Sequence, residues 1–220
     1  MLQSNSTKRG SGIEIWGDYS DLHSLYSTIH KLRNKLDDSK PKDKGQSEIM
    51  MNFAFELRKS FENNRLKQKF SFDSQLETEY YGFKYLWTDL LYLISILRFN
   101  AGYITLNELD QGNLFILEYN IKKALYEYDP IGAQVIEYFI GERININDEL
   151  VALTLNAINI EFLTRKSGKK RFRDIPNLLI AYSPNSKNYK MWKSELEKDA
   201  ERLNCEPHEI EYQKFPDVIW

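Results

Sequence analysis

The chain is poor in cysteine and histidine, and it lacks any long apolar run. Its 220 residues include one cysteine, Cys205, and three histidines. A single cysteine excludes an intramolecular disulfide and indicates a reducing compartment. The longest apolar stretch, residues 90–97, is interrupted by Ser95 and is far shorter than the roughly 20 residues of a membrane span. The polar N-terminus also lacks the apolar segment of a secretory signal. We therefore expect a cytoplasmic protein without a membrane segment.

The overall charge is nearly balanced, which excludes a strong global field. Thirty Lys and Arg residues accompany 32 Asp and Glu residues, so the net charge of −2 attracts neither nucleic acid nor a membrane surface. The charges are unevenly distributed, however. Residues 31–69 hold 11 bases and 6 acids, residues 106–161 hold 3 and 10, and residues 165–173 hold six bases and no acid. A partner could recognise this asymmetry, but solubility also accounts for it.

Aromatic residues are abundant, with 14 tyrosines and 12 phenylalanines. A chain of this length can bury roughly 70–75% of its unfolded surface, so a core without metal or disulfide is feasible. No Gly/Ser-rich linker separates two apolar regions. We predict a disordered leader over residues 1–11 and a single globular domain over residues 12–220.

The first part of that domain, residues 12–87, is predicted to mix strands and helices. The segment GIEIWG reads as a strand, and a helix follows it, with apolar residues at helical spacing from Leu22 to Leu36. Residues 37–47 are charged and contain Pro41 and Gly45, which indicates a mobile loop before a helix from about Glu48. Alternating aromatic residues over 69–75 and 78–87 then predict a pair of strands.

The second part, residues 88–205, is predicted to be a helical body followed by a tail over 206–220. Residues 89–103 are apolar nearly all round, which is typical of a central helix. Further helices are expected after the cap-type residues Thr105, Asp129, Asn147, Asp174 and Ser186. The fold class is thus α+β and mainly helical, with a small N-terminal antiparallel or mixed sheet packed on a helical body.

The segment TRKSGKKRFR (164–173) is the most distinctive candidate site. We expect it to be a loop that contacts an anionic partner, because Lys and Arg neutralise charge and the backbone near Gly168 can approach a phosphate closely. Phe172 could stack on a base. A solvated loop whose bases complement the end of the preceding helix is the competing interpretation. The spacing is not that of a P-loop. The candidate binding residues are Arg165, Lys166, Lys169, Lys170, Arg171 and Arg173.

The remaining chemical signals are weak. His23 and His30 are separated by two helical turns, too far to share one metal ion easily. Cys205, His208 and Glu209 fall short of the four ligands of a structural zinc site. No motif predicts a cofactor, a metal ion or a catalytic residue.

One short pattern resembles an enzyme family. Arg202 and His208 are spaced as Arg-x5-His, similar to the Arg-x4-6-His signature of the helical HEPN ribonucleases, which cleave RNA without a metal. Leu203 stands where that family prefers a polar residue, and Pro207 interrupts the spacing. The resemblance implies a metal-independent nuclease or another hydrolase as an alternative function.

A dense aromatic set lies in the first part of the chain. It could form a ligand groove, a homo-oligomeric interface or a core rich in aromatic rings beneath the sheet. Trp220, at the chain end, is either a buried anchor or an exposed hook. The aromatic set comprises Trp16, Tyr80, Tyr81, Phe83, Tyr85 and Trp87.

Three segments in order, GIEIWGDYSDLHSLY, YYGFKYLWTDLLYLISILRFNAGY and SGKKRFRDIP, resemble a family of uncharacterised bacterial proteins. The resemblance implies a bacterial origin and no activity. Our leading hypothesis is therefore a non-enzymatic interaction module of a bacterial cytoplasmic system, with an anionic partner or another protein at residues 165–173. Nucleic acid is one such anionic partner. A hydrolytic enzyme and a homo-oligomeric structural subunit are the alternatives.

Overall fold

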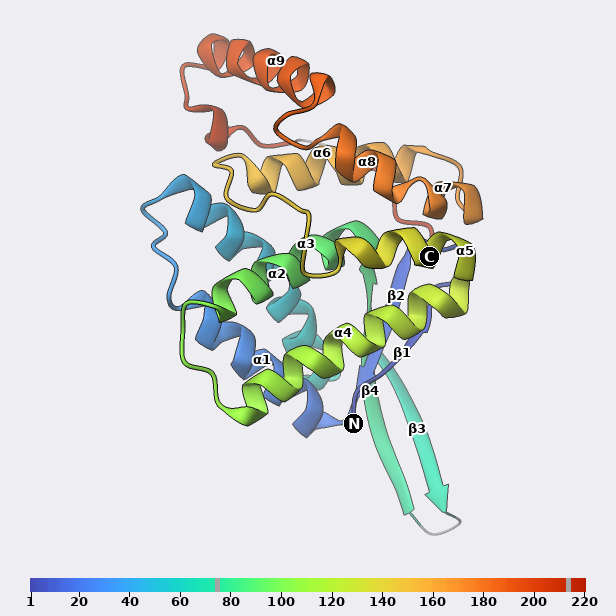
Figure 1. Cartoon of the computed structure of the whole chain (residues 1–220). Helices are drawn as coiled ribbons and strands as arrows, with labels where there is room; N and C mark the ends of the chain where they lie inside the picture. The colour runs from blue at the N-terminus through green and yellow to red at the C-terminus, as the bar shows by residue number, and fades with distance from the viewer. Residues whose placement is uncertain (74–75, 213–214) are drawn as a thin grey trace.

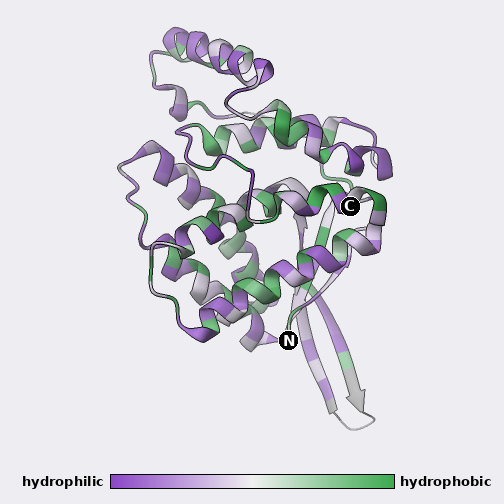
Figure 2. Ribbon diagram, viewed as in Figure 1, coloured by the Kyte–Doolittle hydropathy of each residue, from purple (hydrophilic) through white to green (hydrophobic). Residues whose placement is uncertain are grey.

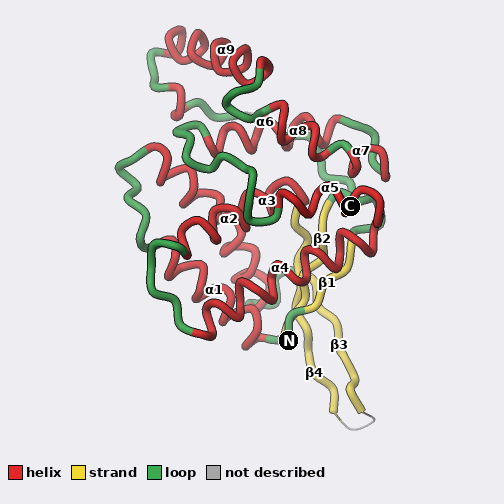
Figure 3. The backbone as a smooth tube through the Cα atoms, viewed as in Figure 1, coloured by secondary structure: helices red, strands yellow, loops and turns green. Residues whose placement is uncertain are grey.

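A computed structural model describes residues 1–73, 76–212 and 215–220. A small sheet lies beside a body of packed helices, and one long hairpin of the sheet projects beyond that body (Figure 1). Figure 3 shows that helices make up most of the molecule and that this hairpin extends beyond them. The predicted α+β class, mainly helical with a small N-terminal sheet, is confirmed.

The sheet has four described strands in the order β1-β2-β4-β3, and every neighbouring pair is antiparallel. The strands are β1 (Gln3–Ser6), β2 (Gly12–Gly17), β3 (Leu66–Asp73) and β4 (Leu76–Leu86). The prediction of a disordered leader over residues 1–11 is wrong in part, because β1 pairs with β2 along its whole length. The hydroxyl of Ser4 also donates to the carbonyl of Asn120, which fixes this polar strand to a helix.

The inner face of the sheet carries the aromatic and branched residues that meet the helices. Ile13 lies opposite Tyr85 and Ile15 lies opposite Phe83, and all four side chains are buried. Residues 74 and 75 of the predicted strand pair lie outside the described residues, as do residues 213 and 214 of the tail.

The first two helices show what local sequence can and cannot reveal. Helix α1 (Tyr19–Arg33) begins with a capping box between Asp18 and Asp21. Helix α2 (Pro41–Phe61) starts well before the predicted position, with Pro41 in its first turn, so the loop predicted over 37–47 is wrong from residue 41 onward. Gly45 is buried in that added length, and a Cβ there would lie 2.7 Å from Cγ1 of Val151.

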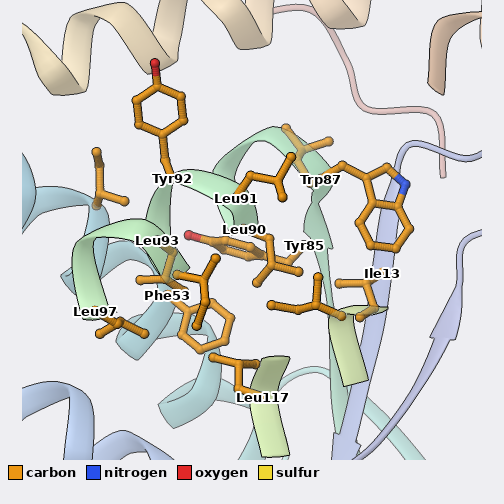
Figure 4. Close-up of a cluster of buried hydrophobic side chains, with 14 of the residues drawn as sticks. Ile13, Phe53, Tyr85, Trp87, Leu90, Leu91, Tyr92, Leu93, Leu97 and Leu117 are labelled. Carbon is orange, nitrogen blue, oxygen red and sulfur yellow. The ribbon is translucent and has the colours of Figure 1, made fainter. Parts of the chain in front are cut away.

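Helix α3 (Trp87–Ala101) is central, as its apolar sequence predicts, and Figure 2 shows it among the most hydrophobic segments. Helix α4 (Glu108–Tyr128) follows, capped by Asn107 and not by the predicted Thr105. Figure 4 shows side chains from α2, α3, α4 and the sheet meeting in one core, with Phe53 and Tyr85 side by side. The Phe53 and Tyr85 rings are 4.9 Å apart and nearly perpendicular.

The later helices are short apart from α6 and α9. They are α5 (Pro130–Ile136), η1 (Glu137–Phe139), α6 (Val151–Thr164), α7 (Lys169–Arg173), α8 (Ile175–Ala181) and α9 (Lys187–Leu203). Asp129 caps α5 and Ser186 caps α9, as predicted. Asn147 does not cap α6, which begins after Leu150. No described helix is long and apolar enough to cross a membrane.

Helix α9 lies at the periphery, where a small second cluster of Leu150, Leu153 and Leu196 holds it. Figure 2 shows that most of its residues are hydrophilic. The tail contains the 3-10 turn η2 (Pro207–Glu209) and then runs back to the body, where Trp220 is partly buried against the main core.

Candidate functional site

The basic segment 164–173 lies between two helices, at the outer edge of the helical body. Helix α6 ends at Thr164, and Arg165 turns the chain into extended backbone. Gly168 then adopts a φ of +131°, a conformation that L side chains rarely take, and a Cβ at this position would meet nothing within 4 Å. Residues 169–173 form the short helix α7, so the prediction of a loop holds for its first half only.

Two of the six bases are neutralised by carboxylates from outside the segment. Arg165 pairs with Glu161 on the last turn of α6 and with Asp174 just after α7. Arg173 donates from Nε and Nη2 to the two carboxylate oxygens of Asp129, at 2.6 and 2.9 Å. These arginines therefore fix the segment to the body and have little capacity left for a ligand.

Asp129 binds the segment 164–173 through Arg173 and Lys169. Its side chain is only 2% exposed, and it also accepts a hydrogen bond from the backbone N–H of Gly132 in the first turn of α5. The hydrogen bond from Arg173 lowers the pKa of Asp129 to about 2, with further lowering from Gly132 and Lys169. Nζ of Lys169 lies 3.5 Å from this carboxylate, but that lysine remains largely exposed. One buried carboxylate thus organises α5 and α7 together.

Phe172 belongs to the core. It is fully buried, with its ring 4.9 Å from that of Tyr128 and 5.8 Å from that of Trp87. The prediction that it could stack on a nucleic-acid base is wrong, because the side chain has no exposed surface.

Arg171 is the exception among the six bases. It is 4% exposed, and no carboxylate pairs with it among the described residues. Nη2 donates to the hydroxyl of Ser11 at 2.6 Å, and the guanidinium lies 4.4 Å from the ring centre of Phe162. Its Nε is buried without a hydrogen-bond partner, and burial lowers the pKa of the guanidinium. A buried charged side chain normally has a counter-ion, because removing an ion from water costs roughly several kcal/mol.

A hollow of about 590 Å³ opens over this arginine. Lys166 and Lys170 stand at its rim, exposed and without an ion pair in the described part of the chain. Lys169 is the third exposed lysine at this hollow. The hollow is lined by Arg165, Lys166, Ser167, Gly168, Lys169, Lys170, Arg171 and Asp174.

The histidines do not form a site. His23 is exposed and stacks on Tyr19, with 5.5 Å between the ring centres. His30 contacts Tyr26, and burial, with Arg33 and Arg58 nearby, lowers its pKa. Across the described residues, no group of three or more His, Cys, Asp or Glu side chains could hold a metal ion.

The residues of the nuclease-like pattern lie at the end of α9 and in η2. Arg202 is largely exposed and pairs with Asp199 at 3.0 Å. No hydrogen bond joins it to His208 among the described residues. A nearby hollow is lined by Cys205 and Glu209 but by neither Arg202 nor His208. The geometry therefore does not favour the hydrolytic alternative.

The dense aromatic set is mostly core. Five of its six members are at most 8% exposed, and Tyr81 is partly buried. Several exposed apolar side chains lie elsewhere, on α4, α5 and η1. They include Phe115, Tyr119, Ile131, Val135 and Tyr138. An oligomeric interface made from the predicted aromatic set would require the core to open.

Sequence reasoning found the basic segment but missed what neutralises it. Asp129 is 44 positions from Arg173 in the chain. Glu161 is the exception, because it lies one helical turn before Arg165 and that spacing is readable from sequence.

Comparison with known proteins gives a family and no activity. A family model described as a domain of unknown function (DUF6904) matches residues 2–220. The match confirms the predicted resemblance to an uncharacterised family, while the bacterial origin stays a prediction. Searches of the curated proteins and of the solved structures found no match.

Proposed function

Since the chain belongs to the DUF6904 family, whose function is unknown, we propose from its own surface that it is a non-enzymatic binding module for an anionic partner. The contact surface is the hollow over α7. The single observation that carries the proposal is Arg171, a guanidinium buried without a carboxylate at a surface rimmed by three exposed lysines. We further place the module in a bacterial cytoplasm, a reducing compartment that suits a chain with one cysteine.

The residues divide into two roles in this proposal. Lys166, Lys169 and Lys170 attract the partner from solvent, where long-range attraction depends on salt. Arg171 binds one phosphate or carboxylate group of that partner, since a guanidinium presents parallel N–H donors to such groups. Arg165 and Arg173 hold the segment in place through their own acids.

Phosphate-bearing or carboxylate-bearing groups suit this site better than bases of a nucleic acid do. The buried Phe172 removes the stacking platform that single-stranded nucleic acid prefers. The basic surface over α7 is also small, and Glu161, Asp174 and Asp129 neutralise two of its arginines. A protein or small molecule with a clustered negative charge is the partner that we infer.

Retention on a heparin column, read as the salt concentration at elution, tests the proposal. Two of the three exposed lysines, those without an ion pair among the described residues, are reversed in the double variant K166E/K170E. Arg171 is left unchanged, since a carboxylate at this buried position would compromise folding. The matched control is K187E/K190E, which reverses two exposed lysines of α9 beside another hollow. We expect elution at clearly lower salt for the first variant only. Equal losses in both variants would mean that net charge alone governs retention and would overturn the proposal.

A further inference from the structure

A second pocket, of about 240 Å³, lies between α2, α3 and α6, and its character is opposite to that of the basic hollow. Its lining contains three carboxylates, two amides and one phenol, with no lysine, arginine or histidine. The lining residues are Glu48, Ile49, Asn52, Phe55, Glu56, Tyr85, Asp89, Ala152, Leu155 and Asn156.

Helix geometry brings the polar groups of this pocket together. Glu48, Asn52 and Glu56 occupy successive turns of α2, so they form a stripe on one face. Ala152 and Asn156 occupy successive turns of α6 in the same way. The close approach of α2 to α6 at the buried Gly45, where a Cβ would lie 2.7 Å from a methyl group of Val151, sets the two stripes near each other.

Asp89 is the carboxylate that the protein holds most firmly. It lies in the first turn of α3, and Nδ2 of Asn159 on α6 donates to its Oδ1 at 2.6 Å. The hydroxyl of Thr88 donates to the side-chain oxygen Oδ1 of the same Asn159, which fixes the side-chain amide in this orientation. Oδ2 of Asp89 has no hydrogen bond or ion pair among the described residues, so this oxygen is available to a ligand.

Tyr85 supplies an independent indication of a ligand. Its side chain is 8% exposed, it lines the pocket, and its hydroxyl has no hydrogen-bond partner in the described part of the chain. Figure 4 shows the ring reaching away from β4 with the hydroxyl oxygen at its far end. The hydroxyl is the accessible end of a side chain that is otherwise buried, so it can donate to or accept from a ligand in the cavity.

Of the three carboxylates, one is already neutralised from outside the pocket. Arg65 donates from Nε and Nη2 to Glu56 at 2.7 and 2.9 Å. Glu48 and Asp89 form no ion pair among the described residues. Partial burial raises the pKa of Glu48 against the opposing charge of Lys44, and burial raises the pKa of Asp89, which has no cation beside it in the same part of the chain. The positive charge is therefore missing at the Asp89 end of the pocket.

We propose that this pocket binds a small organic cation, an alkyl diamine, with one ammonium group at Asp89 and Tyr85. An ammonium has three N–H donors, and the pocket offers Oδ2 of Asp89, the hydroxyl oxygen of Tyr85 and an amide carbonyl of Asn52 or Asn156 as acceptors. Ile49, Ala152 and Leu155 provide an apolar wall for the alkyl chain, and Glu48 is the carboxylate available to the second ammonium. The volume corresponds to roughly eight waters, which suits a short diamine.

A metal ion is a poorer fit than an amine. No group of three or more potential ligands of the His, Cys, Asp and Glu types comes together among the described residues. Calcium and magnesium need six or more oxygen ligands in a compact shell, whereas this pocket presents apolar walls between its polar groups.

The test is a calorimetric titration of the whole protein with 1,5-diaminopentane. The neutral 1,5-pentanediol and magnesium chloride serve as comparison titrants. We expect saturable binding of the diamine alone. D89N should weaken it at least about tenfold and Y85F by several fold, as expected when a hydrogen bond to a charged group is lost. D199N, which removes an exposed carboxylate of α9, should bind as the unmodified chain does.

Three outcomes would overturn the proposal. Equal affinity in D89N and the unmodified chain would place the amine elsewhere. Binding of the diol as tightly as the diamine would show that charge plays no part. Saturable binding of magnesium without the diamine would make this a metal site. Thermal unfolding of each variant, followed by circular dichroism, ensures that a loss of binding is not a loss of fold.

Discussion

Asp129 and Arg173 form a two-point ion pair across 44 residues of chain, with donor–acceptor distances of 2.6 and 2.9 Å. The carboxylate is almost fully buried, while the guanidinium remains half exposed. The same carboxylate caps α5, so one side chain stabilises the start of one helix and the position of another. This pair fixes α7 against the start of α5.

We expect D129N to destabilise the protein at neutral pH. The change leaves Arg173 without its partner and weakens the cap of α5, for a combined loss of about 2–4 kcal/mol. Urea denaturation followed by circular dichroism measures it. D199N removes the exposed partner of Arg202 and should change the free energy of unfolding by less than about 0.5 kcal/mol. Similar losses in both variants would contradict the role given to Asp129.

The pH dependence of stability should show the Asp129 pair at the acid end. Its pKa falls to about 2 in the folded protein, from 3.8 in the unfolded chain. The unfolded state therefore binds the proton first, and the stabilisation is complete above pH 4 and lost as the pH falls through 2. D129N should remove that part of the acid destabilisation, which a series of urea titrations between pH 2 and 5 would detect.

Asp89 should act in the opposite direction. Burial raises its pKa to about 6, opposed in part by Asn159, so the unfolded chain ionises first between pH 4 and 6 and stability falls as the pH rises through that window. Tyr85 from β4 and Glu48 and Glu56 from α2 line the same pocket, and Asn159 from α6 donates to Asp89.

We therefore expect D89N to be more stable than the unmodified chain at pH 7, by up to roughly 3 kcal/mol, and equally stable at pH 4. Urea titrations at the two pH values measure the difference. E48Q is the control, because Glu48 is more exposed than Asp89 and Lys44 opposes the effect of its partial burial, so its substitution should give a smaller change. A D89N variant that is less stable at pH 7 would show that ionised Asp89 is needed for folding.

How much the sequence alone reveals differs between the fold and the site. Capping residues such as Asp18 and Asp129 signal helix starts, because their side-chain chemistry is local. The start of α2 is harder to predict, because the Lys, Asp and Gly residues around Gly45 are typical of a loop, whereas in the structure Gly45 packs against Val151 of α6. Phe172 was misread because its neighbours are charged, while its burial depends on Trp87 and Tyr128 far away in the chain.

Gly82 should tolerate no side chain. A Cβ there would lie 2.6 Å from two ring carbons of Trp16 on β2, so we expect G82A to cost about 1–3 kcal/mol through overpacking. Gly112, in the interior of α4, has nothing within 4 Å of the corresponding point. G112A should therefore stabilise the protein by about 0.5–1 kcal/mol through helix propensity. Thermal melts of both variants distinguish the effects, and a neutral G82A would contradict the packing at Trp16.

Replacing Arg171 should separate binding from stability. R171M keeps the length of the side chain and removes a buried charge that has no carboxylate, and such replacements are often neutral or stabilising. We expect the free energy of unfolding to stay within about 1 kcal/mol or to rise, because methionine can maintain the contact with Phe162. Retention on heparin should fall, since the proposed binding site loses the guanidinium that contacts the anion.

The outcome that contradicts this assignment is a strongly destabilised R171M that retains normal affinity for heparin. That result would mean that the hydrogen bond to Ser11 and the contact with Phe162 are the reason for the arginine, and that its charge serves the fold. K170M is the matched control, because Lys170 is exposed at the rim of the same hollow. It should lower retention without changing stability. Only the combination of a stable R171M and reduced retention in both variants assigns the buried guanidinium to a ligand.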